Sequence, residues 1–466
     1  RYGPEMVEFF HQRTAVQFLS GSAMPDFHPS PGAANGGRSV TAQPYDGRLL
    51  GDWLHRLRPP LETISLGGMG IAGGADMAHF FNATRSPRSA LYAARRLLRH
   101  GWQRLRAGRG QHLVNGNALV ARLLRSALDA GVRFQLNAPV VRLLQGPPGV
   151  SGAVLRSDGG EIHVEAGAVV LACGGFPHDR QRLAQVVPHA AEGYGHFSAA
   201  PPDNQGEGIR LGESVGGQFD TSLRHPLAWA PVSRVTLASG QQLMFPHLVE
   251  RAKPGVIAVL PNGKRFVNEA DSYHDFIAAL LAATPAGDTP QAWLLADRRA
   301  LRRYGLGHAR PFPFTPTAWL RTGYLQRGNT LAELAKQCAI DANALAETVE
   351  RFNHFASAGE DVDFHRGASA YNRAQGDHQV TLGPLREGPF YAVRILPGSL
   401  GTFSGLQTDE HARVLDEQQL PIPGLYAIGN DMSSVMRGYY PSGGITLGPA
   451  MTFGYLVGKG LTKKQI

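Results

Sequence analysis

The 466-residue chain has little cysteine and no apolar run long enough to cross a membrane. Its two cysteines, Cys173 and Cys338, make neither a disulfide framework nor a metal-binding spacing, and without a long apolar run no transmembrane helix is expected. Only 18% of the residues are charged while 43% are hydrophobic, which excludes an intrinsically disordered chain. We therefore expect a packed cytoplasmic protein with more than one domain.

Acidic residues are missing between Met77 and Leu128, although this stretch carries ten arginines. Apolar residues recur within it at roughly helical spacing over 90–105. A basic amphipathic helix is typical of a peripheral contact with an anionic membrane, here through the 85–125 segment; a solvated helix face is the other interpretation. Neither an aromatic platform nor a nucleic-acid motif accompanies the arginines, so we do not expect nucleic acid as a partner.

The most informative stretch lies between Pro423 and Ala450. A buried apolar strand is expected to end at a Gly-Asn turn at 429–430, and a glycine pair then precedes a helix expected over 449–457. Free N–H groups at a helix start attract an anion or a polarised oxygen. Tyr440, just ahead of the glycine pair, adds a hydroxyl group. This stretch therefore predicts a site that holds polar ligand atoms.

A second glycine turn, Cys173-Gly174-Gly175, follows a buried strand expected over 168–172, and Gly206-Glu207-Gly208 opens a further helix. Glycine at such turns lets the backbone approach a nucleotide or phosphate closely. The preceding residues predict a helix and four strands, over 117–130, 132–136, 140–144, 152–156 and 162–164. We interpret 115–185 as one compact nucleotide-binding region.

Together these motifs resemble those of the fumarate reductase/3-ketosteroid dehydrogenase superfamily of FAD-dependent flavoproteins. The sequence Tyr-Pro-Ser-Gly-Gly at 440–444, followed by Leu-Gly-Pro-Ala at 447–450, is most similar to the ketosteroid dehydrogenase branch. The resemblance implies an α/β fold: a Rossmann-like FAD-binding domain at 1–224 and 401–466, with an inserted α+β substrate and catalytic domain at 225–400. The amino-terminal GxGxxG unit of such flavoproteins is absent, so we interpret the FAD-binding domain as incomplete and the chain as truncated or incompletely covered there.

One literal GxGxxG match runs from Gly68 to Gly73. It follows only a short strand, expected over 63–66, and the next acidic residue after Asp76 is Asp129. A dinucleotide site needs an acid about 20 residues after the glycines to bind the ribose. We therefore interpret this match as a glycine-rich loop without a phosphate-binding role.

The resemblance also assigns catalytic residues. Residues 262–269 are expected to form a turn and a strand, and Tyr273 stands four residues after the Arg-Phe-Val-Asn-Glu motif at 265–269. It matches the tyrosine that removes a proton in ketosteroid dehydrogenases, where fumarate reductases have a proton-donating arginine. Tyr440 and the backbone N–H of Gly444 would polarise a ketone oxygen. Ser442 resembles the Δ4-(5α)-dehydrogenase pattern, and a turn-capping serine is the alternative.

The expected cofactor is FAD, held at several places along the chain. Asn430 and Asp431 are candidates for the ribityl chain, the N–H of Leu447 for the flavin O2 edge, and Val140 for the adenine region. The remaining candidates are Cys173, Gly174, Gly175, Gly206, Gly208, Gly429, Gly443 and Thr446. The helper tyrosine of relatives falls on Met24–His28, where this chain offers Phe27 and His28.

The implied reaction is Δ1-type α,β-dehydrogenation of a 3-ketosteroid or similar hydrophobic cyclic ketone, with hydride passing to FAD N5 and electrons to an external acceptor. The cationic clamp of fumarate reductases is absent, since 440–442 lacks their arginine and 398–404 lacks their histidine. Three alternatives remain open. They are a Δ4-(5α)-dehydrogenase, a flavin reductase of another unsaturated substrate, and a non-catalytic ligand-binding chain that lacks its pyrophosphate segment.

Overall fold

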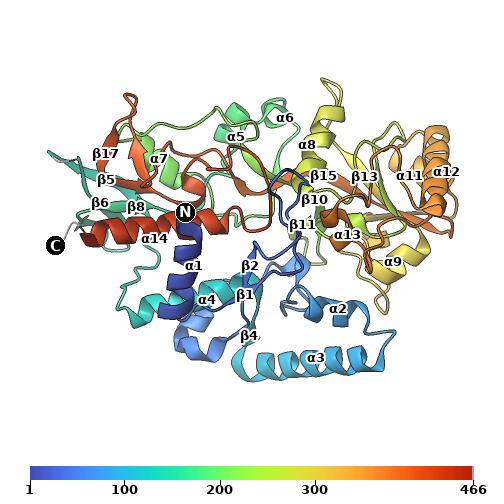
Figure 1. Cartoon of the computed structure of the whole chain (residues 1–466), viewed down its shortest axis with the longest axis horizontal. Coiled ribbons are helices and arrows are strands. Elements are labelled where there is room, and N and C mark those ends of the chain that lie inside the picture. The colour runs from blue at the N-terminus through green and yellow to red at the C-terminus, as the bar shows by residue number, and fades with distance from the viewer. Residues whose placement is uncertain (148, 464–466) are drawn as a thin grey trace. The chain divides into compact units, whose positions relative to one another are not determined.

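The computed structural model describes residues 1–147 and 149–463, which form two compact units. Unit 1 comprises 1–9, 133–229 and the residues from 398 onward, and unit 2 comprises 10–132 and 230–397. The chain can be followed by colour in Figure 1. The domain division expected from the sequence differs from these units because it assigns 10–132 to the FAD-binding domain, and it stays a prediction.

Unit 1 is built around two small sheets. One pairs β5, β6 and β7 in antiparallel order, and the other places β17 between antiparallel β16 and parallel β8. Its elements are β5 (Val140–Gly146), β6 (Gly149–Ser157), β7 (Gly160–Glu165), β8 (Val169–Leu171), α5 (Arg180–Val186), α6 (Pro188–Ala191), β9 (Phe197–Ser198), α7 (Glu207–Glu213), β16 (Arg413–Leu415), β17 (Pro421–Ala427), η4 (Gly429–Asp431) and α14 (Leu447–Lys463). Because β8 and β17 are parallel, their carboxyl ends meet at one sheet edge.

Unit 2 centres on a sheet in the order β11-β10-β15-β13-β12, with β14 also paired to β15. Its strands are β1 (Phe18–Ser20), β2 (Val40–Ala42), β3 (Tyr45–Asp46), β4 (His112–Leu113), β11 (Gln242–Pro246), β12 (Val256–Val259), β13 (Ala292–Ala296) and β14 (Leu325–Gly328). The chain passes between the units within α1 (Tyr2–Arg13), after residue 132, and within β10 (Leu227–Thr236) and β15 (Phe390–Thr402).

The helices of unit 2 are η1 (Gly47–Arg56), η2 (Glu62–Ile64), α2 (Ala75–Phe81), α3 (Pro87–Ala107), α4 (Asn115–Asp129), η3 (Glu250–Ala252), α8 (Tyr273–Ala283), α9 (Arg298–Tyr304), α10 (Thr317–Arg321), α11 (Leu331–Cys338), α12 (Ala342–Ala358) and α13 (Ala370–Gln375). Apolar side chains of α11 and α12 pack on the sheet; Leu334 and Leu345 join Leu295 in one fully buried cluster. Within the described parts of the chain, no helix has the length and apolarity needed to cross a membrane.

Most elements expected from apolar periodicity are present, and the α/β fold class is confirmed. The helix expected over 117–130 is α4, that over 90–105 is α3, and that over 449–457 is α14. The strands expected over 140–144, 152–156, 162–164 and 168–172 are β5, β6, β7 and β8. Ser86 caps α3 by accepting a hydrogen bond from Ser89 N–H, and Gly108 ends it in the left-handed conformation.

Three expected strands were wrong. Residues 132–136 alternate in apolarity but pair with no strand that the structure describes, and Phe134 is 39% exposed. Residues 63–66 fall in η2, in the bend at Ser65 and in an isolated bridge between Leu66 and Met69. Residues 265–269 form an irregular segment because side chains, rather than a neighbouring strand, bond to backbone N–H groups here. Asn268 accepts a hydrogen bond from the N–H of Ala270, and Glu269 accepts one from the N–H of Ala258 in β12.

Candidate active site

The carboxy-terminal loop of unit 1 holds the largest group of predicted site residues. It runs from the end of β17 through η4 to the start of α14. Tyr440 and Ser442 are buried in this loop, and the ring centre of Tyr440 lies 5.9 Å from that of Phe403. The first N–H groups of a helix have no partner within it, and Leu447 at the start of α14 is 55% exposed. This helix end is therefore accessible to a ligand.

Several predicted glycines surround the same helix end. Gly444, next to Gly443, is exposed with φ of +90°, and Gly429 begins η4 with φ of +63°. Gly429, Asn430 and Thr446 line one small cleft of about 20 Å³, room for about one water molecule. The structure thus brings these predicted residues together at the junction of β17 and α14.

Asp431 is fully buried at the shared carboxyl edge of β8 and β17. Its carboxylate accepts hydrogen bonds from the backbone N–H groups of Cys173 and Gly175, the latter at 2.9 Å. Burial raises the pKa of Asp431, and these backbone N–H groups only partly oppose that shift. The carboxylate therefore holds the glycine turn in place, while its contact with a ribityl chain stays a prediction.

Two of the predicted glycines are required by packing within unit 1. A Cβ on Gly175 would lie 2.1 Å from Oγ1 of Thr402 and 2.9 Å from the carbonyl oxygen of Asn430. A Cβ on Gly208, in the first turn of α7, would lie 2.2 Å from Oδ2 of Asp431. Contacts this short would force the turn and η4 apart, so both positions need glycine before any ligand is considered.

The other predicted cofactor positions lie around this turn or at the start of β5. Gly174 and Gly206 both have positive φ, of +95° and +82°, and Gly206 precedes the first residue of α7. Val140 begins β5 and is 37% exposed. Cys173 is exposed as well. The structure thus leaves Val140 and Cys173 at the surface of unit 1.

Tyr273, the predicted base, belongs to unit 2 and is the first residue of α8. Ser272 caps this helix by accepting a hydrogen bond from the N–H of Asp275 at 3.1 Å. The ring of Phe27 meets that of Tyr273 edge-on at 5.7 Å between centres, and on another side it lies 4.4 Å from the ring of Tyr371. The sequence predicted Tyr273 but gave no motif for Tyr371.

His28 makes a close contact with the same helix turn. Its Nε2 lies 2.7 Å from Oδ2 of Asp275, and the hydroxyl of Ser272 donates to that oxygen at 2.7 Å. The hydrogen bond to Asp275 raises the pKa of His28 despite partial burial. Burial alone would raise the pKa of Asp275, but the hydrogen bonds from His28 and Ser272 outweigh burial and lower it. The pair is therefore ionised over a widened pH range.

Arg251 brings a buried positive charge near Tyr273. Its guanidinium donates to three backbone carbonyls, those of His247 at 2.7 Å, Glu269 at 2.8 Å and Asp271 at 3.2 Å. Burial lowers the pKa of Arg251, and attraction to Tyr371, to acidic neighbours and to Tyr273 opposes that shift. The guanidinium is thus held against the backbone segment that leads into α8. The sequence gave no signal for this arginine.

The Arg-Phe-Val-Asn-Glu motif that precedes Tyr273 is a buried ionic network. Glu269 is fully buried and lies 2.7 Å from Arg265 and 3.0 Å from Arg366. Burial would raise the pKa of Glu269, but the two arginines outweigh burial and hold it well below its ordinary value. Arg265 also pairs with Asp361 at 2.8 Å. This network anchors the segment that leads into α8.

A Ser–His–Glu arrangement also occurs in unit 2. His247 Nε2 lies 2.7 Å from Oγ of Ser233, and its Nδ1 lies 2.6 Å from Glu250. The distances suit a nucleophile and its base. However, Ser233 is 1% exposed and its hydroxyl also bonds to Tyr324 at 2.8 Å. We interpret this network as structural because a substrate has no access to the serine.

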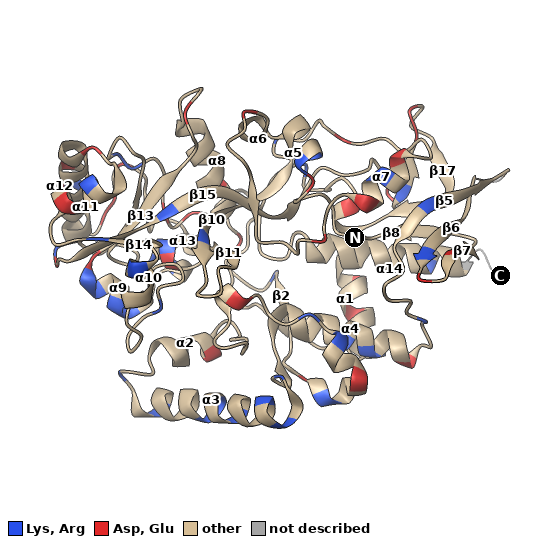
Figure 2. Ribbon diagram, turned by 180° about the vertical axis from the view of Figure 1, so that it is seen from behind, with Lys and Arg blue, Asp and Glu red and all other residues tan. Residues whose placement is uncertain are grey.

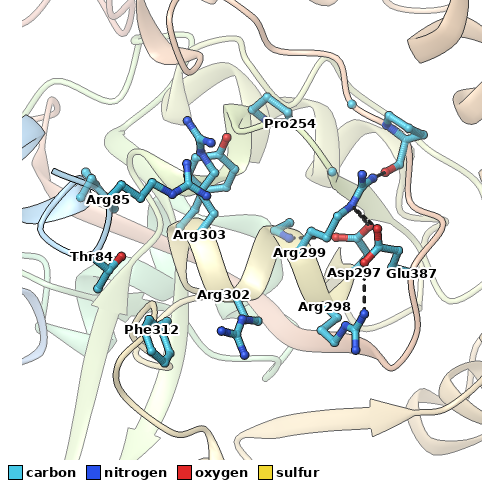
Figure 3. Close-up of a pocket in the computed structure, with 16 residues that line it drawn as sticks. Thr84, Arg85, Pro254, Asp297, Arg298, Arg299, Arg302, Arg303, Phe312 and Glu387 are labelled. Atoms are coloured by element: carbon cyan, nitrogen blue, oxygen red, sulfur yellow. Dashed lines mark hydrogen bonds and ion pairs between the residues drawn. The ribbon is translucent and has the colours of Figure 1, made fainter.

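A larger cleft in unit 2, of about 820 Å³, lies between the α2–α3 connection and α9 (Figure 3). Arginines line it, but several are paired: Arg298 and Arg299 with Glu387, and Arg303 with Asp377. None of the predicted catalytic or cofactor residues is among those that line it. Size alone therefore does not identify the active site.

Comparison with known families gives one match that spans most of the chain. A family model described as FAD binding domain matches residues 1–447. The chain is 39% identical to 4-oxocyclohex-2-ene-1-carboxylate 5-dehydrogenase from Sinomonas cyclohexanicum, covering 99% of this chain and 79% of that protein. It is 35% identical to 3-oxosteroid 1-dehydrogenase from Mycolicibacterium smegmatis, covering 97% of this chain and 80% of that protein.

A solved structure shares the fold as well as the sequence pattern. It is 3-ketosteroid delta1-dehydrogenase from Sterolibacterium denitrificans, in complex with 1,4-androstadiene-3,17-dione. The match has a TM-score of 0.89 and 35% identity, and it covers 99% of this chain and 84% of that chain. The fold expected from the carboxy-terminal motif is therefore confirmed.

Proposed function

We propose that this chain, which belongs to the FAD binding domain family, is an FAD-dependent dehydrogenase that introduces a double bond beside the carbonyl of a cyclic ketone. The family match over 1–447 establishes a flavoprotein oxidoreductase of the CH–CH class. The observation that best supports a ketone substrate is Tyr273 at the first position of α8, with Phe27 against its ring and the Arg251 guanidinium bonded to the backbone just ahead of that helix.

The residues of unit 1 fit an FAD. The glycine turn stands at the end of β8, where α/β proteins bind nucleotides, and its positive-φ glycines let a ligand approach the backbone closely. The start of α14 offers backbone N–H groups. We assign Val140, Cys173, Gly174 and Gly206 to the dinucleotide, and Asn430 and the N–H of Leu447 to the flavin half. When bound, FAD supplies the hydride acceptor, and an external electron acceptor reoxidises it.

Tyr273 is the proposed general base. It would take the proton from the carbon next to the ketone while hydride leaves the neighbouring carbon, so that two hydrogens are lost and an enone forms. A tyrosine with a reference pKa of about 10 must be stabilised as phenolate to act in this way. We assign that stabilisation to the amino end of α8, where the helix dipole favours negative charge, and to the buried guanidinium of Arg251, which donates to the carbonyl of Asp271 two residues before Tyr273.

Tyr440 and the backbone N–H of Gly444 are the proposed carbonyl donors. Hydrogen bonds from these groups would stabilise the enolate oxygen that develops as the α-proton leaves. Gly444 is exposed with φ of +90° and has no side chain, so a ligand oxygen can approach its backbone N–H group. Ser442 is 7% exposed and belongs to the same loop. We propose that Ser442 helps to determine whether the enzyme carries out Δ1 or Δ4-(5α) desaturation.

Two classes of cyclic ketone are candidates. A 3-ketosteroid is supported by the steroid dehydrogenase structure, which matches at a TM-score of 0.89. A single oxocyclohexene ring with a carboxylate is supported by the 39% identity to the Sinomonas enzyme, above the 35% identity to the steroid enzymes. The carboxylate would require a cation, which a steroid would not. We favour the Δ1-type ketosteroid reaction and keep the ring carboxylate as the second candidate.

Anaerobic bleaching of the flavin absorbance tests the proposal. Purified protein loaded with FAD is mixed with a 3-ketosteroid, with 4-oxocyclohex-2-ene-1-carboxylate, and with fumarate plus a reductant. A ketone dehydrogenase loses its flavin absorbance with a ketone alone and yields the enone or dienone. Reoxidation of reduced flavin by fumarate, without bleaching by either ketone, would overturn the proposal. Product analysis then separates Δ1 from Δ4 desaturation.

A further inference from the structure

Helix α3 of unit 2 presents its polar side to the protein and its apolar side outward. Ser89, Ala93 and Gln103 are its buried residues. The most exposed large apolar side chains of α3 are Leu91 at 73%, Leu98 at 76%, Trp102 at 54% and Leu105 at 89%. Their spacing of seven, four and three residues places all four on one helix face. A soluble helix normally buries such a face, so this arrangement calls for a partner.

Polar contacts fix the rotation of α3. The hydroxyl of Tyr92 donates to Asp76 at 2.8 Å. Farther along the helix, His100 and Arg104 both contact the backbone carbonyl of Gly67, at 3.0 and 3.1 Å. These contacts use the side opposite the apolar face. Turning the leucines inward would break each of them, so the apolar face is held outward by the fold itself.

Arginines border the apolar face. Arg88, Arg95, Arg99 and Arg106 follow its edge at helical spacing, and the guanidinium of Arg106 lies 4.6 Å from the ring centre of Trp102. Figure 2 shows basic residues along α3 without an acidic residue among them. The surface therefore combines aliphatic side chains, an interfacial tryptophan and uncompensated positive charge.

The remaining arginines of the 85–125 segment do not all share this role. Arg122 is buried and donates to the backbone carbonyls of Ala15, Gln43 and Pro44. Arg109 donates to backbone carbonyls at the end of η1. These two side chains bind backbone carbonyls within unit 2 and are not available to a membrane. Of the 85–125 segment expected to contact a membrane, only α3 therefore keeps that role.

We propose that α3 lies flat on an anionic phospholipid bilayer, with its leucines and Trp102 in the acyl boundary and its arginines at the headgroup phosphates. A second copy of the chain fits this face less well, because two faces that are both bordered by arginines repel one another. Nucleic acid is poorer too, since the centre of the face is aliphatic and offers bases no stacking platform. The inference does not depend on which ketone the protein oxidises.

Vesicle flotation tests this docking surface. FAD-loaded protein is floated with phosphatidylcholine vesicles, with and without phosphatidylglycerol, at low and high salt. We expect binding to the anionic vesicles, weakening with salt, and a blue shift of tryptophan fluorescence that Trp102→Phe diminishes. Leu98→Gln should weaken binding roughly tenfold, and adding Leu91→Gln and Leu105→Gln should bring the loss to roughly a thousandfold.

Matched variants keep the test decisive. Leu49→Gln alters a leucine of unit 2 that is 59% exposed but lies outside α3, and it should bind vesicles like the wild type. The flavin spectrum and the turnover of a water-soluble ketone report whether each variant is folded. Equal flotation of the wild type and the triple variant would overturn the proposal. So would the absence of vesicle binding together with a dimer that the triple variant abolishes.

Discussion

His28 and Asp275 form a 2.7 Å ion pair on the helix turn that begins with Tyr273. The two residues are 247 positions apart in the chain. Ser272, the cap of that helix, donates to the same carboxylate oxygen. The pair therefore ties a loop near the amino-terminal end of unit 2 to the turn that carries the proposed base.

We expect the contribution of this pair to stability to depend on pH. The pKa of His28 is raised, so its contribution is complete below about pH 6.5 and is lost as pH rises through the raised value. The pKa of Asp275 is lowered, so its contribution is present above about pH 4 and is lost as pH falls through the lowered value. His28→Gln should therefore lower the melting temperature more at about pH 5.5 than at about pH 9. The same substitution in an Asp275→Asn background serves as control, since the pair is already broken there and no such difference is expected.

Tyr273→Phe should abolish most of the activity while sparing the cofactor. Removing a general base costs about a hundredfold to ten-thousandfold in kcat, and the flavin spectrum should stay unchanged because Tyr273 lies outside the proposed FAD contacts. Stopped-flow bleaching by the ketone measures the effect. Tyr304→Phe, which removes another phenol of unit 2 that donates to Asp377, is the control. Comparable bleaching rates in the two variants would refute the role of Tyr273 as base.

Tyr440→Phe tests the carbonyl donor. Loss of one oxyanion donor costs about a hundredfold to a thousandfold in kcat. The neighbouring Tyr439 is 50% exposed and accepts a hydrogen bond from Arg224, so Tyr439→Phe should leave turnover near the wild-type rate. Steady-state kinetics on the preferred ketone measure both variants. An unchanged kcat for Tyr440→Phe would remove this tyrosine from the mechanism.

Gly175→Ala should destabilise unit 1 and weaken FAD retention. The added methyl would stand 2.1 Å from Thr402 Oγ1, so the glycine turn must move. We expect a loss of about 1–3 kcal/mol from overpacking, in addition to the cost of a positive φ. Gly193→Ala controls for that cost, because Gly193 has φ of +85° but no atom within 4 Å of its Cβ position. Thermal unfolding and the FAD content after gel filtration measure the difference.

Glu269→Gln should be among the more damaging substitutions in unit 2. It leaves Arg265 and Arg366 buried without their shared counter-charge, and breaking a buried pair costs about 3–5 kcal/mol. Asp363→Asn, which breaks the exposed pair with Arg351, should lower the free energy of unfolding much less. Because the pKa of Glu269 is lowered, its contribution in the wild type persists above about pH 4 and is lost as pH falls further. Urea unfolding of both variants measures the contrast.

Sequence patterns predicted the segments whose structure is local. The carboxy-terminal motif gave the family, and the turn at 173–175 was expected to need glycine. The strand expected over 132–136 was wrong because alternation does not supply a pairing partner. The Arg-Phe-Val-Asn-Glu motif was expected to include a strand, but Asn268 and Glu269 use their side chains to satisfy backbone N–H groups.

The sequence by itself determined the family, the FAD cofactor and the identity of the proposed base, because these depend on short runs of residues with fixed spacing. The resemblance also named Phe27 and His28, but only the tertiary structure showed that His28 pairs with Asp275 on the first turn of α8 and that Arg251 bonds to the backbone just before that helix. Tertiary structure also decided that the leucines of α3 face outward. Periodicity defines an apolar face, but only contacts with distant residues, such as that of Tyr92 with Asp76, decide which way the face turns.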